Sequence, residues 1–208
     1  MPDGSELLLN TNSRVYADFS GNARKLTLEQ GELYVRVAHD PVHPLTVRAA
    51  DKVVRAVGTE FNVVIAQNQD VEVIVTQGKV LIGVTERSPA PQAVGGKDAE
   101  IPVVAGERIL LNSEKQVVNE INADELTVKL SWRDGNIIFR GEPLAIALNE
   151  IEKYTPVEFL IQDEQLKTIR VAGLFKAGDV DGLLATLKQN FNISYERAGQ
   201  DTIVLKSN

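Results

Sequence analysis

The sequence contains no cysteine in its 208 residues, and it has only two histidines and one tryptophan. The absence of cysteine excludes disulfide bonds, thiol catalysis, iron–sulfur clusters and the commoner zinc sites. Long apolar runs are also missing, because no stretch approaches the roughly 20 residues of a membrane helix. The start of the chain lacks the apolar core of a signal peptide. We therefore expect the sequence as given to be soluble.

Basic charge and aromatic side chains are scarce as well. The chain has 22 lysines and arginines against 29 aspartates and glutamates, which gives a formal net charge of −7. This balance argues against nucleic acid or an anionic membrane surface as a partner. With 43% apolar residues the composition is that of an ordinary globular protein, and the length allows one large domain or two small ones.

The common catalytic motifs are absent too. The sequence contains no G-x-S-x-G elbow, no phosphate-binding G-x-x-x-x-G-K-[ST] loop and no H-E-x-x-H pair. Glu32 and Glu60 could pair as the two carboxylates of a glycosidase, but nothing in the sequence brings them together. We interpret both as polar positions on exposed strand faces or in turns. No catalytic residue, metal ligand or cofactor is expected.

The two histidines lie four residues apart, as His39 and His43, in the stretch HDPVH. Histidines at this spacing can share a metal on a helix, whereas a strand separates them by about 13 Å. The two prolines within and just after this stretch exclude a helix. We therefore predict that a strand ends at Val37-Ala38, that the chain turns at Asp40-Pro41, and that another strand begins at Leu45. A metal site and a pH-sensitive surface contact are the alternatives.

Residues 1–122 show a strand-like pattern almost throughout, with short runs rich in valine, isoleucine and leucine. A phrase that begins with glycine recurs, as GSELLLN from Gly4, GELYVRV from Gly31, GKVLIGV from Gly78 and GERILLN from Gly106. Because glycine tolerates a positive φ, we predict glycine turns that each start a strand, and so an all-β domain of stacked hairpins. The stretch Arg87 to Glu100, rich in proline, glycine and alanine, is expected to be a mobile loop.

The pattern changes after a polar segment, residues 123–131, which we expect to be a linker. Two helices are predicted, Pro143 to Tyr154 and Val180 to Phe191, because each places its apolar residues on one face; Asp179 is a plausible N-cap of the second. Around them lie the candidate strands Ile137–Arg140, Val157–Ile161, Thr168–Phe175, Ile193–Arg197 and Thr202–Leu205. The order βαββαββ makes residues 132–208 a small α+β domain.

Few polar or aromatic residues of this second domain suggest a site. Trp132 and Phe139 flank its first strand, where aromatic side chains usually anchor a core, and sugar stacking is the alternative. Asp163 and Glu164, together with Arg170, are interpreted as solvated surface. We therefore predict structural roles for these residues.

Several phrases resemble, in order and spacing, the periplasmic region of FecR-like proteins. They are DGSELLLNTNSRVYADF (residues 3–19), RKLTLEQGELYVRVAHDPVHPLTV (24–47) and VRAVGTEFNVV (54–64). SWRDGNIIFRGEPLAIALNEIEKY (131–154) and RVAGLFKAGDVDGLLATLKQNFNI (170–193) resemble the short domain, named STN, at the N-termini of secretins and of signalling TonB-dependent transporters. Leu45 stands where the family usually has phenylalanine, which is a volume-conserving change.

The resemblance implies an inner-membrane sigma-factor regulator, or anti-sigma factor. In such proteins a cytoplasmic segment holds an extracytoplasmic-function sigma factor, and one helix crosses the membrane. The periplasmic part engages the N-terminal signalling domain of a TonB-dependent transporter for a ferric siderophore or citrate, and periplasmic and intramembrane proteases then free the sigma factor. The resemblance also implies that HDPVH is a structural turn. Because the sequence opens on the DGS phrase, we expect it to be the periplasmic fragment of such a regulator.

The leading functional hypothesis is a protein-interaction module that receives a signal. An exposed sheet edge can accept a partner strand through main-chain hydrogen bonds. We expect such an edge at Ile193 to Arg197 or at Thr202 to Leu205. The residues expected to bind the partner are Ile193, Tyr195, Thr202 and Val204.

The alternative hypothesis is a ligand-binding module, in which the β half recognises cell-wall glycan or a siderophore directly. Such a module would need a concave site lined by aromatic side chains, whereas Tyr16, Phe19, Tyr34 and Phe61 are scattered along the sequence. An enzyme is the third hypothesis.

Overall fold

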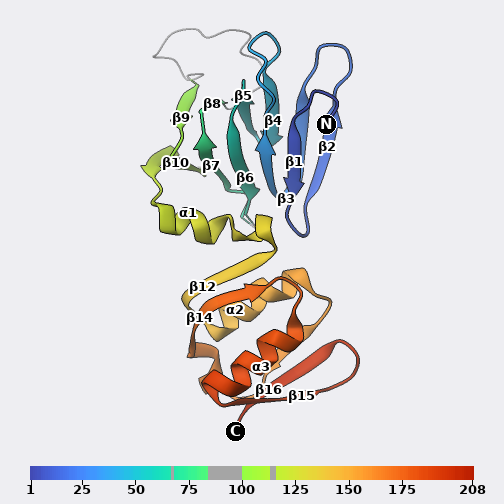
Figure 1. The fold of residues 1–208 in the computed structure, drawn as a ribbon, viewed down its shortest axis with the longest axis vertical. Helices are drawn as coiled ribbons and strands as arrows, with labels where there is room; N and C mark the ends of the chain where they lie inside the picture. Colours follow the sequence, from blue (N-terminus) through green and yellow to red (C-terminus); the bar gives the residue numbers. More distant parts are fainter. Residues whose placement is uncertain (67, 84–99, 113–115) are drawn as a thin grey trace. The chain divides into compact units, whose positions relative to one another are not determined.

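The computed structural model describes residues 1–66, 68–83, 100–112 and 116–208 (Figure 1). The chain forms two compact units, Met1–Asn122 and Ala123–Asn208. The first unit is mainly β and the second is α+β, so the predicted change of class along the chain is confirmed. The loop expected at Arg87 to Glu100 lies outside the described residues, except for Glu100. Within the described ranges, no helix is long and apolar enough to cross a membrane.

The first unit is an eleven-stranded sheet that nearly closes on itself like a barrel. Its strands are β1 (Glu6–Leu9), β2 (Arg14–Asp18), β3 (Lys25–Arg36), β4 (Leu45–Ala49), β5 (Lys52–Ala56), β6 (Glu60–Ile65), β7 (Val71–Gln77), β8 (Lys79–Gly83), β9 (Ile101–Val104), β10 (Glu107–Leu111) and β11 (Gln116–Glu120). The long strand β3 belongs to both halves of this sheet. Its first part pairs with β2 and β4, and its second part pairs with β1 and β6.

The core of this unit lies between the two halves of the sheet. Alternate residues of each strand point inward, as Leu33 and Val35 do on β3, while Glu32 and Arg36 point outward. The buried cluster consists of valine, leucine, isoleucine and two alanine residues together with Phe61, in agreement with the strand-like pattern of the sequence. The cluster therefore needs strands of both halves to be complete.

Glycines stand where the chain crosses from one half of the sheet to the other. Gly31, Gly58, Gly78 and Gly106 have φ values of 86°, 147°, 80° and 83°. Gly31 lies inside β3, at the point where this strand changes partners. Three of these glycines begin the recurring phrases. Gly78 and Gly106 precede β8 and β10 directly, so the predicted start of a strand is confirmed there, but the strands on either side of them do not pair, and the expected hairpins at these glycines are wrong. A hairpin and a corner both require positive φ, so the sequence pattern does not distinguish them.

The second unit has the predicted order βαββαββ. Its elements are α1 (Ala123–Lys129), a 3₁₀ turn (Ser131–Asp134), β12 (Asn136–Pro143), α2 (Leu144–Ile151), a 3₁₀ turn (Glu152–Tyr154), β13 (Glu158–Ile161), a 3₁₀ turn (Glu164–Thr168), β14 (Arg170–Lys176), α3 (Val180–Phe191), β15 (Ile193–Arg197) and β16 (Thr202–Ser207). The strands form a two-stranded sheet, β12-β14, and a three-stranded sheet, β13-β16-β15. Residues of both sheets and of helices α2 and α3 share one core.

Local details of this unit differ from the expectation at two places. Most of the expected linker, residues 123–131, is helical, as α1 and the start of a 3₁₀ turn. This helix has seven residues and none of them is buried. A short helix without a buried face needs no apolar stripe, and the sequence therefore did not indicate it. Pro143 is the N-cap of α2 instead of its first helical residue. Asp179 caps α3 as predicted, because its side chain accepts a hydrogen bond from the Gly182 N–H.

Replacing Gly31 by alanine should destabilise the first unit more than the same change at Gly106. Both positions have positive φ, which strains an alanine by about 1–3 kcal/mol. Only at Gly31 does a Cβ atom also collide with backbone, 2.6 Å from Ser13 Cα and 2.8 Å from the Asn12 carbonyl oxygen. Urea unfolding of both variants measures the difference in the free energy of unfolding, and equal losses would contradict a tight corner at Gly31.

Candidate functional site

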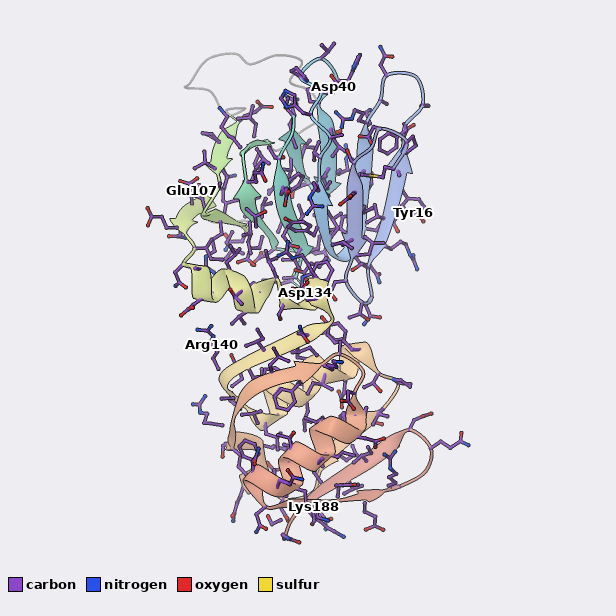
Figure 2. All side chains as sticks on the ribbon, in the orientation of Figure 1. Tyr16, Asp40, Glu107, Asp134, Arg140 and Lys188 are labelled. Atoms are coloured by element: carbon purple, nitrogen blue, oxygen red, sulfur yellow. The ribbon has the colours of Figure 1, made fainter. Side chains whose placement is uncertain are left out.

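The HDPVH stretch forms a loop between β3 and β4, as the sequence predicted, with Asp40 at the end of the strands (Figure 2). The Asp40 carboxylate accepts hydrogen bonds from the backbone N–H groups of Val42 and His43, at 3.0 and 3.1 Å. These bonds, with the His43 ring nearby, hold the pKa of Asp40 below its usual value. His39 packs against Gly58, where a Cβ atom would collide with its ring. No group of three metal-binding side chains occurs among the described residues.

A buried arginine fixes this loop to the N-terminal segment. The Arg24 side chain is only 6% exposed and donates hydrogen bonds to the Asp3 carboxylate, to Ser5 Oγ and to the backbone carbonyls of Ala38 and His43. Ser5 Oγ accepts a bond from the Ala38 N–H at 2.9 Å. Burial by itself raises the pKa of Asp3, but the hydrogen bonds from Ser5 and Arg24 outweigh it and lower this pKa. The DGS and HDP phrases therefore meet at a structural junction.

The two glutamates that could have formed a glycosidase pair are not brought together. Glu60 pairs with Arg36 across β3 and β6 and accepts a hydrogen bond from the Tyr34 hydroxyl at 2.6 Å. Glu32 accepts hydrogen bonds from the side-chain amides of Asn10 and Asn62. On β3, Glu32 lies four residues from the partner of Glu60, which corresponds to about 13 Å along the strand. Each carboxylate therefore accepts hydrogen bonds within its own part of the sheet.

Of the residues that the structure describes, the aromatic ones do not gather into a binding surface. Phe139 is buried, and its ring lies 5.6 Å from that of Phe175, so its predicted role in the core is confirmed. Tyr16 lies exposed on β2 (Figure 2), whereas Tyr34 and Phe61 are buried. A hollow of about 250 Å³ beside Arg24 is lined by one aromatic residue, Phe19, together with small or apolar residues such as Pro2 and Ala23 and polar residues such as Asp40.

The expected solvated surface at Asp163 includes one structural contact. The Asp163 carboxylate accepts a hydrogen bond from the Ser207 N–H at 2.7 Å, and this bond lowers the pKa of Asp163. Glu164 forms an exposed ion pair with Lys167, and Arg170 donates to the Gly141 carbonyl. Asp163 therefore fastens the end of β16.

Strand β15 is an edge of the three-stranded sheet, and β16 lies in its middle. The expectation that Thr202 to Leu205 could supply a free edge is therefore wrong. After the β15–β16 hairpin, β16 also pairs in parallel with β13, and this pairing carries no signal in the local sequence. Of the two strands that we named, only β15 can accept a partner strand.

The backbone of β15 offers its outer groups at Tyr195 and Arg197. The Ala198 N–H donates to the Thr202 carbonyl at 2.9 Å, so Ala198 faces β16. Because backbone groups alternate along an antiparallel strand, Ser194 and Glu196 also face β16, whereas Tyr195 and Arg197 face away from it. The Arg197 side chain reaches Asp181 on α3 at 2.7 Å. An exposed ion pair thus links the edge strand to the helix.

The four expected partner-binding side chains lie on two faces of this sheet. Ile193 is fully buried in the core, and Tyr195, on the same face, is 39% exposed. Thr202 and Val204 are half-buried on the opposite face. Val204 lies opposite Leu160 of β13, which is 45% exposed. The sequence missed Leu160 because only the parallel pairing brings β13 to this place.

Comparisons with known proteins agree with this architecture. The family described as FecR protein matches residues 1–81, and the family described as FecR, C-terminal, matches residues 136–205. Two crystal structures of a candidate anti-sigma factor from Parabacteroides distasonis ATCC 8503, at 1.65 and 2.50 Å resolution, each have a TM-score of 0.67 and 21% identity. Each match covers 100% of this chain and 92% of that chain, and shows the fold alone. No curated protein matches the chain.

Replacing Asp3 by asparagine should lower the free energy of unfolding by about 1–3 kcal/mol at pH 7, because a buried charged hydrogen bond to Arg24 is weakened. The pKa of Asp3 is lowered in the folded protein, so its contribution is present above its usual value of 3.8 and is lost as the pH falls further. Urea unfolding from pH 7 to pH 3 should therefore show the two proteins converging. Glu164→Gln, at an exposed ion pair with Lys167, is the control, and a gap independent of pH would contradict the assignment.

Proposed function

Because this chain belongs to the FecR family of anti-sigma regulators, we propose that it is the region of such a regulator that receives the signal in the periplasm. Members of the family are non-enzymatic and act on a sigma factor. They are inner-membrane proteins with a periplasmic domain. The sigma factor would be bound by a cytoplasmic segment, and the region described in this structure would lie on the other side of the membrane.

The proposed partner is the N-terminal signalling domain of a TonB-dependent outer-membrane transporter. Its binding would control an extracytoplasmic-function sigma factor for iron or siderophore uptake genes. The match of residues 136–205 to the C-terminal FecR family and the βαββαββ order support a small signalling domain of the STN kind. A domain that exposes the edge of a small sheet suits a partner that docks by strand addition.

The open edge of β15 is the observation that carries this proposal. Tyr195 and Arg197 present outward-facing backbone groups, and Tyr195 adds an exposed aromatic ring beside them. A partner strand would continue the sheet in the order β13-β16-β15-partner. Ile193 would then support the edge from the core, and Thr202 and Val204 would lie one strand away from the contact.

The first unit would serve as a spacer or a gate for protease access. Glycine corners join the two halves of its sheet, and the Arg24 junction fixes its N-terminal segment. The family's periplasmic and intramembrane proteases would act only after a strand or loop of this unit becomes exposed. Residues 1–122 would thus act as a barrier to proteases and residues 123–131 as a connection. Residues 132–208 would act as the domain that receives the signal.

Tyr195→Pro in the whole chain tests the proposed edge. Proline removes the outward-facing N–H of Tyr195 and leaves the ladder between β15 and β16 intact, since edge strands tolerate proline. We expect calorimetric titration with the transporter's signalling domain to show at least about a fivefold weaker affinity, the loss of roughly one hydrogen bond. Circular dichroism should show an unchanged fold.

Two further variants control this experiment. Tyr195→Ala removes the ring and keeps the N–H, so it separates the side-chain contribution from the backbone contribution. Glu196→Pro removes an inward-facing donor and should unfold the hairpin. Unchanged affinity in a folded Tyr195→Pro variant would contradict docking at β15 and would move the partner site elsewhere.

A further inference from the structure

The three-stranded sheet has a second edge, at β13, whose backbone pattern can be derived in the same way. The Glu158 N–H donates to the Asp201 carbonyl and the Gln162 N–H donates to the Leu205 carbonyl, at 2.7 and 2.9 Å. In a parallel pair, N–H groups of alternate residues point to the same neighbour. Glu158, Leu160 and Gln162 therefore face β16, and Phe159 and Ile161 point their N–H groups away from it.

A glutamate side chain occupies this second edge. Glu152 Oε1 accepts a hydrogen bond from the Phe159 N–H at 2.7 Å. Glu152 begins the 3₁₀ turn that follows α2, so the core-packed helix places its carboxylate beside β13. Phe159 is itself buried, which keeps the N–H that it offers in a fixed position. One of the two outward N–H groups of β13 is thus taken by a group of the same chain.

The two edges of the sheet therefore differ. In the part of the chain that the structure describes, no side chain bonds the outward backbone groups of Tyr195 and Arg197 of β15. Two edges that were both open could pair with each other in neighbouring copies, since a strand edge is a template for another strand. Such pairing would be head-to-tail, and it would build either a closed ring or an open filament of copies.

We propose that Glu152 closes the β13 edge against the β15 edge of a second copy of this chain. The carboxylate competes with an incoming strand for the Phe159 N–H, so a strand that pairs there must first displace this hydrogen bond. The closed edge leaves one open edge per copy, so the sheet accepts a single added strand. Glu152 thus determines which edge of the sheet can accept an added strand. The inference concerns the opposite edge from the proposed partner site.

Glu152→Ala in the whole chain tests this assignment by sedimentation velocity over a range of protein concentrations. We expect the weight-average mass to rise with concentration. At concentrations low enough to keep the variant monomeric, hydrogen exchange at the Phe159 amide should become about tenfold faster. Glu152→Gln retains an acceptor oxygen and should stay monomeric. Glu150→Ala is the matched charge control, because Glu150 lies two residues before Glu152, at the end of α2, and its carboxylate bonds the exposed side chain of Lys153.

A double variant, Glu152→Ala with Tyr195→Pro, identifies the strand that adds. Loss of self-association in the double variant supports pairing between β13 and β15 of different copies. Glu152→Ala that remains monomeric at all concentrations, or association that persists in the double variant, would overturn the proposal. Transporter binding is measured separately on Tyr195→Pro alone, so a failure of the proposed partner site leaves the result on Glu152 intact.

Discussion

The β unit depends on one backbone constraint: the chain must turn sharply between the two halves of the sheet without leaving its polar groups unpaired. Gly31 meets it inside β3, where Ser13 Oγ accepts a hydrogen bond from the Glu32 N–H at 2.8 Å. The same hydroxyl lies 3.0 Å from the Glu32 carbonyl oxygen. A side chain at Gly31 would remove the space that Ser13 needs. Both halves of the core therefore rest on a position that only glycine fills well.

The motifs that mark the family lie at such junctions and not at a catalytic site. Arg24 gathers the DGS segment and the HDP loop, while Gly58 of the GTEF phrase gives room to His39. The backbone adds to this, since the Val37 N–H donates to the Thr59 carbonyl and the Asp40 N–H donates to the Val57 carbonyl. The histidine pair, which suggests metal chemistry in the sequence, thus lies in a loop whose hydrogen bonds stabilise the sheet.

Local sequence patterns predicted the helices and strands better than they predicted which strands pair with each other. The alternation of apolar residues predicted the strands of both units, and the apolar faces of α2 and α3 with the Asp179 cap predicted those helices, because these signals act within a few residues. The corners and the central position of β16 were not predictable, since they depend on partners far away in the sequence. For the same reason the sequence suggested β15 as an edge but also suggested β16, and it gave no indication of Glu152.

The position of β16 has a consequence for how the second unit is made. This strand follows β13 and β15 in the chain but lies between them, and it forms the sheet by pairing with one in parallel and the other in antiparallel orientation. During synthesis, β13 leaves the ribosome about forty residues before its only neighbour in the sheet, so this three-stranded sheet cannot assemble from its N-terminal side. A truncated product that lacks β16 has no such sheet, and an incomplete regulator cannot present the edge that a finished one presents.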